Sequence, residues 1–390
     1  MKTVFLNTSF KLFLAVIVGL LLGQVANEGV IRVILPLKYV LGQLIFFLVP
    51  IIIFGFITPS IARLKKNVSR LLGVSLLLAY LSSLGVAIFA ALVGYNVIPF
   101  LHIHPEVEGI KELPALLFRL DIPPLMAVMS ALVLALTVGL SVTWTKSEKI
   151  EQALYQFQDI VSVMVNRFLI PILPFFIAAN FTVFSYEGAI VSQLPIFFAI
   201  VLIAIVCNAL WLTFLYGVAG VYSRKNPWRV LKHYGPVALT AMGTQSSAAT
   251  LGVAIKAAKK SDILRDDVRD FSIPLFANVH FCGSVLDIVF LVIVISQVLY
   301  GGLPTPATLA VFIPLLGIFA IGAPGLPGGT VVASLGIIQS VLGFDEAGTA
   351  LLLTVFALQD SFGTANNIVS DGALSLILST YSDKNKQEKT

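Results

Sequence analysis

The sequence predicts an all-α membrane protein that crosses the bilayer several times. Of its 390 residues, 58% are hydrophobic and only 12% are charged, and the mean hydropathy is +0.97. A soluble domain is about half apolar and about a quarter charged, so this chain has too few polar side chains to cover a water-facing surface. Long apolar stretches, basic clusters between them and two interrupted apolar segments make the prediction specific.

Eight apolar stretches reach, or with tilt could reach, the about 20 residues that a helical crossing needs. They run over Phe10–Val25, Leu41–Ile61, Leu71–Val97, Pro124–Val142, Val163–Phe184, Leu194–Val221, Phe271–Leu299 and Ala347–Tyr381. The first could also be read as a cleaved secretory signal. The next apolar run follows closely, however, which favours a membrane helix.

Two further apolar segments, Val237–Ala258 and Ala307–Leu342, are interrupted by small, polar or Pro/Gly residues. The basic clusters lie at 63–70, 146–149, 224–232, 256–269 and 384–389. With both termini in the cytoplasm, all five fall inside only if neither interrupted segment crosses the membrane. The sequence therefore predicts eight transmembrane helices plus two re-entrant helical hairpins of opposite entry, a pattern typical of transporters with a site near the midplane.

The two hairpin tips carry polar or broken backbone. Residues 242–251 (MGTQSSAATL) place the hydroxyls of Ser246 and Ser247 in an apolar setting, although small residues also favour plain helix packing. Residues 322–330 (GAPGLPGGT) contain two prolines and four glycines, through which an α-helix does not continue. We interpret this second tip as a gate whose open backbone can contact a ligand; a kink between two short helices is the alternative.

The last apolar stretch carries Asp360, Thr364, Asn367 and Asp371, spaced four, three and four residues apart. This spacing places two carboxylates, an amide and a hydroxyl on one helical face. A carboxylate at mid-bilayer costs about 2.5–3.5 kcal/mol on the insertion scale, so it should be paired or hydrated. Oxygen ligands of this kind suit a small cation or an ammonium group.

The seventh stretch is interrupted between Asn278 and Asp287. His280 could relay a proton there, or could serve as a structural hydrogen-bond donor. Asp287 is a second polar group in the same segment and a candidate partner for His280.

These motifs together resemble the dicarboxylate/amino acid:cation symporters, the glutamate transporter-type family, over nearly the whole chain. Residues 243–251 resemble the family's serine-rich first tip, residues 325–329 (GLPGG) its Gly-Val-Pro-Gly second tip, and residues 360–371 the binding face of its last helix. The resemblance implies a homotrimer in the cell inner (cytoplasmic) membrane that works as an elevator. The scaffold is expected at about 10–64 and 122–185, and the transport domain at about 70–100 and 192–381, including hairpins 228–258 and 307–342.

The resemblance also implies site residues. Substrate contacts carry over to Ser246, Ser247, Ser284, Leu326, Pro327, Gly328, Asp360, Gly363, Thr364 and Asn367. Cation contacts carry over to His280, Asn367 and Asp371. In this scheme Asp360 takes a substrate amino group, Thr364 and Asn367 face the α-carboxylate, and Asp371 with the Asn367 carbonyl binds sodium.

The chain departs from the family at two places. The family's Asn-Met-Asp-Gly-Thr signature reads HFCGS at 280–284, so Cys282 replaces a sodium-binding aspartate and His280 an asparagine. Gly363 and Gln245 stand where family members carry a substrate-reading arginine. A second substrate carboxylate would then be buried without a partner, which is strongly unfavourable. A neutral substrate therefore fits better than an acidic one, and the coupling ion is open between Na⁺ and H⁺.

The sequence thus predicts a cation-coupled secondary transporter for a small amino acid or related carboxylate, with the lipid bilayer and a small solute as its partners. No cofactor is expected apart from the coupling ion. A channel or a transport-inactive binding protein on the same scaffold is the alternative. We do not expect an enzyme, because the sequence has no H-E-x-x-H, nucleophile–base or nucleotide-loop motif. The basic residues follow topology and do not indicate nucleic-acid binding.

Overall fold

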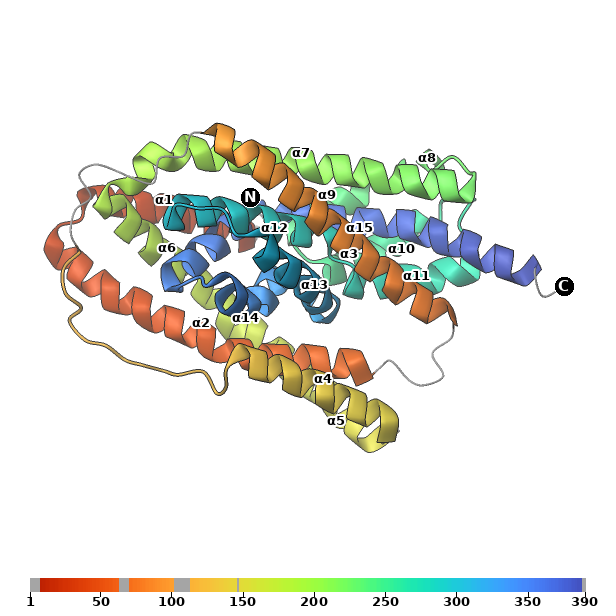
Figure 1. Ribbon diagram of the computed structural model, residues 1–390, viewed down its shortest axis with the longest axis horizontal. Coiled ribbons are helices and arrows are strands. Elements are labelled where there is room, and N and C mark those ends of the chain that lie inside the picture. Colours follow the sequence, from red (N-terminus) through yellow and green to blue (C-terminus); the bar gives the residue numbers. More distant parts are fainter. Residues whose placement is uncertain (1–7, 63–69, 102–112, 146, 388–390) are drawn as a thin grey trace.

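The computed structural model describes residues 8–62, 70–101, 113–145 and 147–387, and the regular elements within these ranges are all helical (Figure 1). The first part contains α1 (Thr8–Val25), α2 (Glu28–Ala62), α3 (Arg70–Val97), α4 (Val128–Thr145), α5 (Glu148–Met164), α6 (Ile170–Glu187) and α7 (Ala189–Ser223). The second contains α8 (Trp228–Leu231), α9 (Gly235–Thr244), α10 (Ser247–Ala258), α11 (Asp266–Val279), α12 (Cys282–Tyr300), α13 (Pro306–Gly322), α14 (Gly329–Leu342) and α15 (Glu346–Gln387).

Within the described residues, five helical stretches are long and apolar enough to span a membrane. They are Glu28–Pro59, Arg70–Leu101, Glu148–Glu187, Phe198–Ser223 and Asp266–Tyr300. Shorter apolar helices include Leu14–Val25 and Val133–Thr145. α15 is not among these five stretches although it is 42 residues long, because the polar residues on one of its faces lower its mean hydropathy. The all-α prediction is confirmed, and several apolar helices are present; the number of eight crossings stays a prediction.

Both interrupted segments are broken within the predicted tips. Between α9 and α10, Gln245 adopts left-handed backbone (φ 50°) and Ser246 is extended. The Ser246 hydroxyl accepts the Ala249 N–H at 3.1 Å and caps α10. Between α13 and α14 the chain turns at Gly328, whose φ of 68° suits glycine. Since α9 packs on α10 and α13 on α14, each pair forms a helical hairpin.

Several helix boundaries differ from those predicted. α2 begins at Glu28 rather than Leu41. Residues 185–193, which separate the fifth and sixth predicted apolar stretches, are mostly helical and are broken at Gly188 with φ 87°. The fifth apolar stretch is preceded by α5, which joins α6 through one π-helical turn at Val165–Leu169. α5 is amphipathic, so it lacks the continuous apolar run on which the prediction depended.

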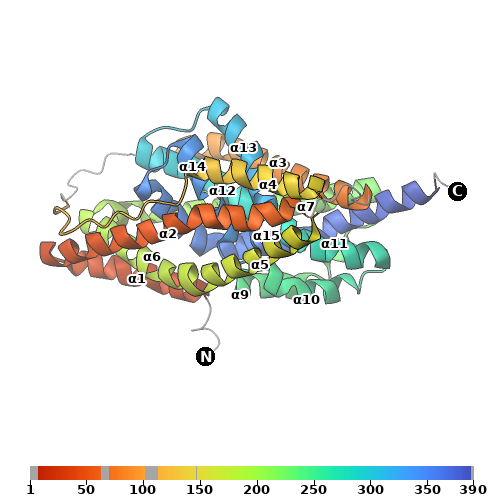
Figure 2. The same ribbon diagram turned by 90° about the horizontal axis from the view of Figure 1, so that it is seen from below.

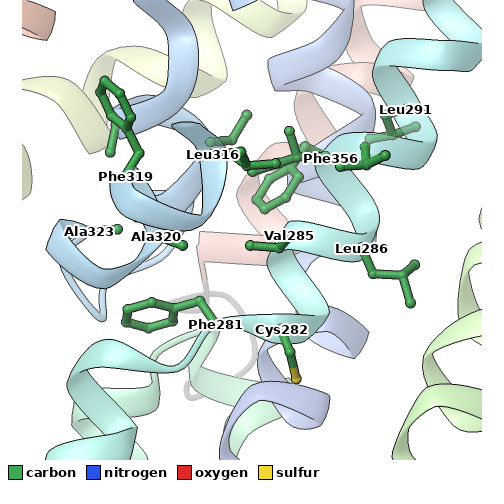
Figure 3. Close-up of a cluster of buried hydrophobic side chains, with 14 of the residues drawn as sticks. Phe281, Cys282, Val285, Leu286, Leu291, Leu316, Phe319, Ala320, Ala323 and Phe356 are labelled. Carbon is green, nitrogen blue, oxygen red and sulfur yellow. The ribbon is translucent and has the colours of Figure 1, made fainter. Parts of the chain in front are cut away.

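The helices pack into two groups. α1 packs on α6, and α2 packs on α4, α5 and α6; Figure 2 shows α1, α6 and α5 along its lower edge, with α2 just above them. In the second group α12 packs on α3 and α15, and α15 also packs on α7, α9 and α11. Side chains of α12 meet Phe356 of α15 and Leu316 of α13 in the core (Figure 3). We call these sets the α2 group and the α12 group.

Basic residues from distant parts of the sequence meet at the end of the molecule where the C-terminus lies (Figure 1). Arg70 lies over the Tyr381 ring at 5.6 Å, and Lys384 over the Tyr222 ring at 4.5 Å. Arg265 forms a 3.0 Å ion pair with Asp383. Other members of the basic clusters, namely Arg63, Lys65, Lys66, Lys146 and Lys389, lie outside the described residues. The cytoplasmic location of this end stays a prediction.

Candidate substrate and cation site

A small pocket lies where the two hairpin tips, the α11–α12 break and the middle of α15 meet. It is lined by Gln245, Ser247, Phe281, Ser284, Pro324, Gly325, Leu326, Gly329, Thr330, Asp360, Thr364 and Asn367. Its cavity volume is ≈ 10 Å³, which is room for about one water molecule. The two tips therefore close the pocket in this structure, and a ligand can enter only when they part.

Asp360 connects α15 to the second hairpin tip. Its Oδ2 accepts the Gly328 N–H at 2.9 Å, and its Oδ1 accepts the Thr364 hydroxyl at 3.2 Å. The residue is only 4% exposed. Asp360, Pro327 and Gly328 also line an adjoining apolar pocket. The carboxylate thus lines the pocket and holds the second hairpin tip beside it.

The two hairpin tips are bonded to each other. Ser246 donates its hydroxyl to the Gly325 carbonyl at 2.5 Å, and the Ala248 N–H reaches the same oxygen at 3.3 Å. Ser246 is therefore placed beside the pocket rather than among its lining residues. Ser247 does line it, and its buried hydroxyl has no hydrogen-bond partner within the described chain. Such an orphaned hydroxyl is available to a ligand.

Asn367 organises the break between α11 and α12. Its Oδ1 accepts the N–H groups of Gly283 (2.7 Å) and Ser284 (3.1 Å), and its Nδ2 donates to the Ser284 hydroxyl at 2.9 Å. The amide thereby satisfies N–H groups at the start of α12, where the preceding residue Phe281 provides no side-chain cap. The Asn367 carbonyl accepts the Ser370 hydroxyl at 2.8 Å.

His280 bridges α15 and α3. Its Nδ1 lies 2.9 Å from Asp371 Oδ1, and its Nε2 lies 2.9 Å from the Ser82 hydroxyl. The suggested pairing of His280 with Asp287 is therefore wrong: Asp287 lies almost two turns further along the chain and contacts α7 instead. Asp371 Oδ2 is buried without a partner in the described residues, which leaves one carboxylate oxygen free for a cation.

Position 363 faces α12 rather than the pocket. A Cβ added to Gly363 would lie 2.3 Å from Asp287 Oδ2, and one added to Gly283 would lie 2.3 Å from the Gly363 carbonyl. Gly363 is accordingly not among the pocket-lining residues. Gln245 does line the pocket, and it donates to the Ala357 carbonyl and the Ser361 hydroxyl, both at 3.2 Å.

The profile of the sodium:dicarboxylate symporter family matches residues 9–381. The chain belongs to this family. The resemblance seen in the three motifs is thus confirmed, and the family is one of transporters rather than enzymes.

Individual relatives cover less of the chain. Neutral amino acid transporter B(0) from Homo sapiens is 27% identical over 170 residues, which is 44% of this chain and 31% of that protein. Excitatory amino acid transporter 1 from Homo sapiens is 27% identical over 228 residues, 56% of this chain and 41% of that protein. The matched region therefore spans less than half of either relative.

In this symporter-family chain, six predicted substrate positions line the pocket, namely Ser247, Ser284, Leu326, Asp360, Thr364 and Asn367. Sequence reasoning did not assign Phe281 or Thr330 to it. Figure 3 shows the Phe281 ring below the end of α13 near Ala323, whereas the Cys282 side chain points away from that ring. The departure of Phe281 from the family signature was a usable signal, because Phe281 sits at the helix break that the pocket adjoins.

Proposed function

We propose that this chain is a secondary transporter that couples uptake of a small neutral amino acid, or a related carboxylate, to a cation gradient. One observation carries the proposal: Asp360 is a buried carboxylate that lies between the ligand space and the second hairpin tip. An ammonium group can pair with this carboxylate, and the orphaned Ser247 hydroxyl can bond the other polar groups of the ligand. When the ligand enters, Asp360 can exchange its bond to Gly328 for one to the ligand.

A neutral substrate is supported by the lining of both pockets. Neither pocket has a Lys or Arg side chain among its described lining residues. The adjoining pocket is lined mainly by apolar side chains: Ile170, Leu173, Val331, Val332, Leu353, Phe356 and Ala357. An acidic side chain would be left unpaired there, whereas an apolar or small neutral one would not. One relative is named a neutral amino acid transporter and the other an excitatory amino acid transporter, so the names of the relatives do not select one substrate.

Two groups support cation coupling. Asp371 Oδ2 has no partner among the described residues, and the Asn367 carbonyl lies one helical turn away on α15. These oxygens suit a sodium ion. His280 joins the same carboxylate and could take up a proton instead. Either Na⁺ or H⁺ can therefore be the coupling ion.

We further propose that the α12 group moves against the α2 group as an elevator, in a homotrimer in the cytoplasmic membrane. The second hairpin, which would move with the α12 group, has an apolar contact with α2 where Gly322 of α13 meets Ile57: a Cβ on this glycine would lie 2.6 Å from Ile57 Cγ1. An apolar contact without interhelical hydrogen bonds can slide without leaving polar atoms unpaired.

The test is uptake by proteoliposomes of radiolabelled neutral and acidic amino acids, under separate sodium and proton gradients. Neutral substrates should accumulate under at least one gradient and should show counterflow. Accumulation of aspartate alone would overturn the neutral substrate. Flux without counterflow would indicate a channel, and binding without flux a transport-inactive protein. Asp383→Asn is the matched control for changes at Asp360, because Asp383 lies on the same helix but pairs with Arg265 far from the pocket.

A further inference from the structure

A second buried polar cluster joins three helices outside the pocket. Asn208 of α7 donates through Nδ2 to Asp287 Oδ1 of α12 at 2.8 Å and to its own helix at the Ala204 carbonyl at 3.0 Å. Asn366 of α15 donates through Nδ2 to Asn208 Oδ1 at 2.8 Å. The three residues are 5%, 1% and 4% exposed. Since Asn208 Nδ2 faces two acceptors, the network itself fixes the orientation of this amide.

This cluster holds more acceptors than donors. Asp287 Oδ2 and Asn366 Oδ1 are both buried without a hydrogen-bond partner in the described part of the chain. Among the described residues, the titratable groups that interact electrostatically with Asp287 are the Cys207 thiol on α7 and the Asp360 carboxyl on α15. Neither can supply positive charge. A buried ionised carboxylate in this position would lack both a cation and a second hydrogen bond.

We propose that Asp287 binds a proton, so that Asn208, Asp287 and Asn366 form a cation site separate from Asp371 and His280. A proton converts Oδ2 from an acceptor into a hydroxyl donor. A protonated Asp287 carries no charge, so the buried carboxyl no longer lacks a cation as its partner. A proton also fits the packing, because the Gly363 backbone lies against Oδ2 and leaves no room even for a Cβ.

The cluster also explains why position 363 is glycine. The Asp287 carboxyl occupies the space that a side chain at 363 would need. Family members are expected to carry an arginine at this position. In this chain the Asp287 carboxyl occupies that space instead, and binding of a proton makes it neutral. The link to transport rests on the proposed function: loss of the proton places a negative charge near Asp360, the proposed amine ligand.

The first test measures thermal unfolding of purified full-length protein without substrate, from mildly acidic to mildly alkaline pH. An unfolded aspartate is ionised across this range, so a protonated Asp287 makes folding take up a proton. Stability should then fall as pH rises. Asp287→Asn supplies an amide donor in place of the acid and should remove this part of the pH dependence. Asp270→Asn, the same change on a half-exposed carboxylate of α11, should retain it.

Two results would overturn the proposal. Equal pH dependence of wild type and Asp287→Asn would show that Asp287 does not titrate. Stabilisation by NaCl over KCl that disappears in Asp287→Asn would show that the occupant is sodium. Because no substrate is present, neither result depends on transport activity.

If Asp287→Asn does not fold, Asn208→Ala provides a second variant. This change removes the hydrogen-bond donor that stabilises the ionised form of Asp287. The pH at which half of the Asp287-dependent stability is lost should therefore be higher in Asn208→Ala than in wild type. An unchanged midpoint would contradict the proposal. In proteoliposomes, Asp287→Asn should flatten the pH profile of uptake several-fold more than Asp270→Asn does. If the wild-type protein shows no uptake, that result would instead contradict the proposed function.

Discussion

Buried polar side chains are held differently in the two groups of helices. In the α2 group, Asn180 and Thr182 donate to carbonyls one turn back on their own helix, at 2.7 and 2.8 Å, and the Ser185 hydroxyl donates to the Leu20 carbonyl of α1 at 2.8 Å. In the α12 group, hydroxyls such as that of Thr354 also bond their own helix. Its buried carboxylate, amide and imidazole groups, however, bond between helices, as in the Asn367 amide at the start of α12 and the His280 bridge from α15 to α3. Polar bonds within a helix survive any rigid-body shift of that helix, whereas bonds between helices resist their separation.

The difference indicates which parts can move. The interhelical bonds tie α3, α11, α12 and α15 into one body, and the second hairpin is attached to it through Gly328 and Gly325 at its tip. Loss of these tip bonds leaves the α12 group otherwise intact. The second tip is therefore the best candidate for the gate, and substitutions at contacts between helices near the pocket should have larger effects than those at the exposed surface.

The largest effect is expected at Asp360. Asp360→Ala removes the proposed amine ligand together with the bond to Gly328. Loss of one partner of a buried ion pair costs about 3–5 kcal/mol, so the affinity for an amine-bearing substrate should fall by more than about 100-fold. Isothermal titration with the transported substrate measures this, with Asp383→Asn as the control. Retained affinity would indicate a ligand without an amino group.

The next largest effect is expected at Gly363. Gly363→Ala forces a methyl group against Asp287 Oδ2, and overpacking of this kind costs about 1–3 kcal/mol. Thermal unfolding should show a lower Tm, and Asp287→Ala should relieve part of the cost in the double variant. Strict additivity of the two changes would contradict the contact. For the same reason, Gly363→Arg should improve binding of acidic substrates only when Asp287 is also replaced by a smaller residue.

A smaller effect is expected at Ser246. Ser246→Ala removes the cap of α10 and the bond to Gly325, and loss of a cap alone costs about 1 kcal/mol. The tips should separate more readily, which a cysteine-accessibility assay at the second tip can detect as faster labelling. Ser340→Ala is the matched control, because Ser340 bonds only its own helix at Gly336. Equal labelling rates in Ser246→Ala and Ser340→Ala would show that the Ser246 hydroxyl does not hold the two tips together.

The smallest effect is expected at the exposed Tyr39–Arg119–Asp121 cluster beside the α2 group. The hydrogen bond from Tyr39, followed by that from Arg119, lowers the pKa of Asp121. This stabilisation is present above the pKa of unfolded aspartate and is lost as pH falls through the lower folded-state pKa. Tyr39→Phe should raise the pKa of Asp121, measurable by NMR titration of the carboxyl carbon, with little change in Tm because the cluster is solvent-exposed. A large change in uptake by Tyr39→Phe would contradict the expectation that transport depends mainly on the bonds of the α12 group.

Much of the helical framework could be predicted from composition and local pattern. The two breaks were predictable because prolines and glycines cannot continue a helix, and the polar face of α15 because spacings of three and four residues align side chains. The start of α5 was not predictable, because an amphipathic helix has no continuous apolar run. Phe281 and Thr330 were missed because local pattern does not show which helix end a pocket adjoins.

The sequence by itself determined that the chain is helical and apolar, where its helices break, and which carboxylates must lie among apolar residues. Tertiary structure alone decided the partners of those residues. His280 meets Asp371 rather than Asp287, and Asp287 meets Asn208, across 91 and 79 positions of sequence. Helix periodicity places each side chain on a face of its own helix, but the partner depends on which helix packs against that face. For this reason the roles of Gly363 and Asp287 became visible only in the folded chain.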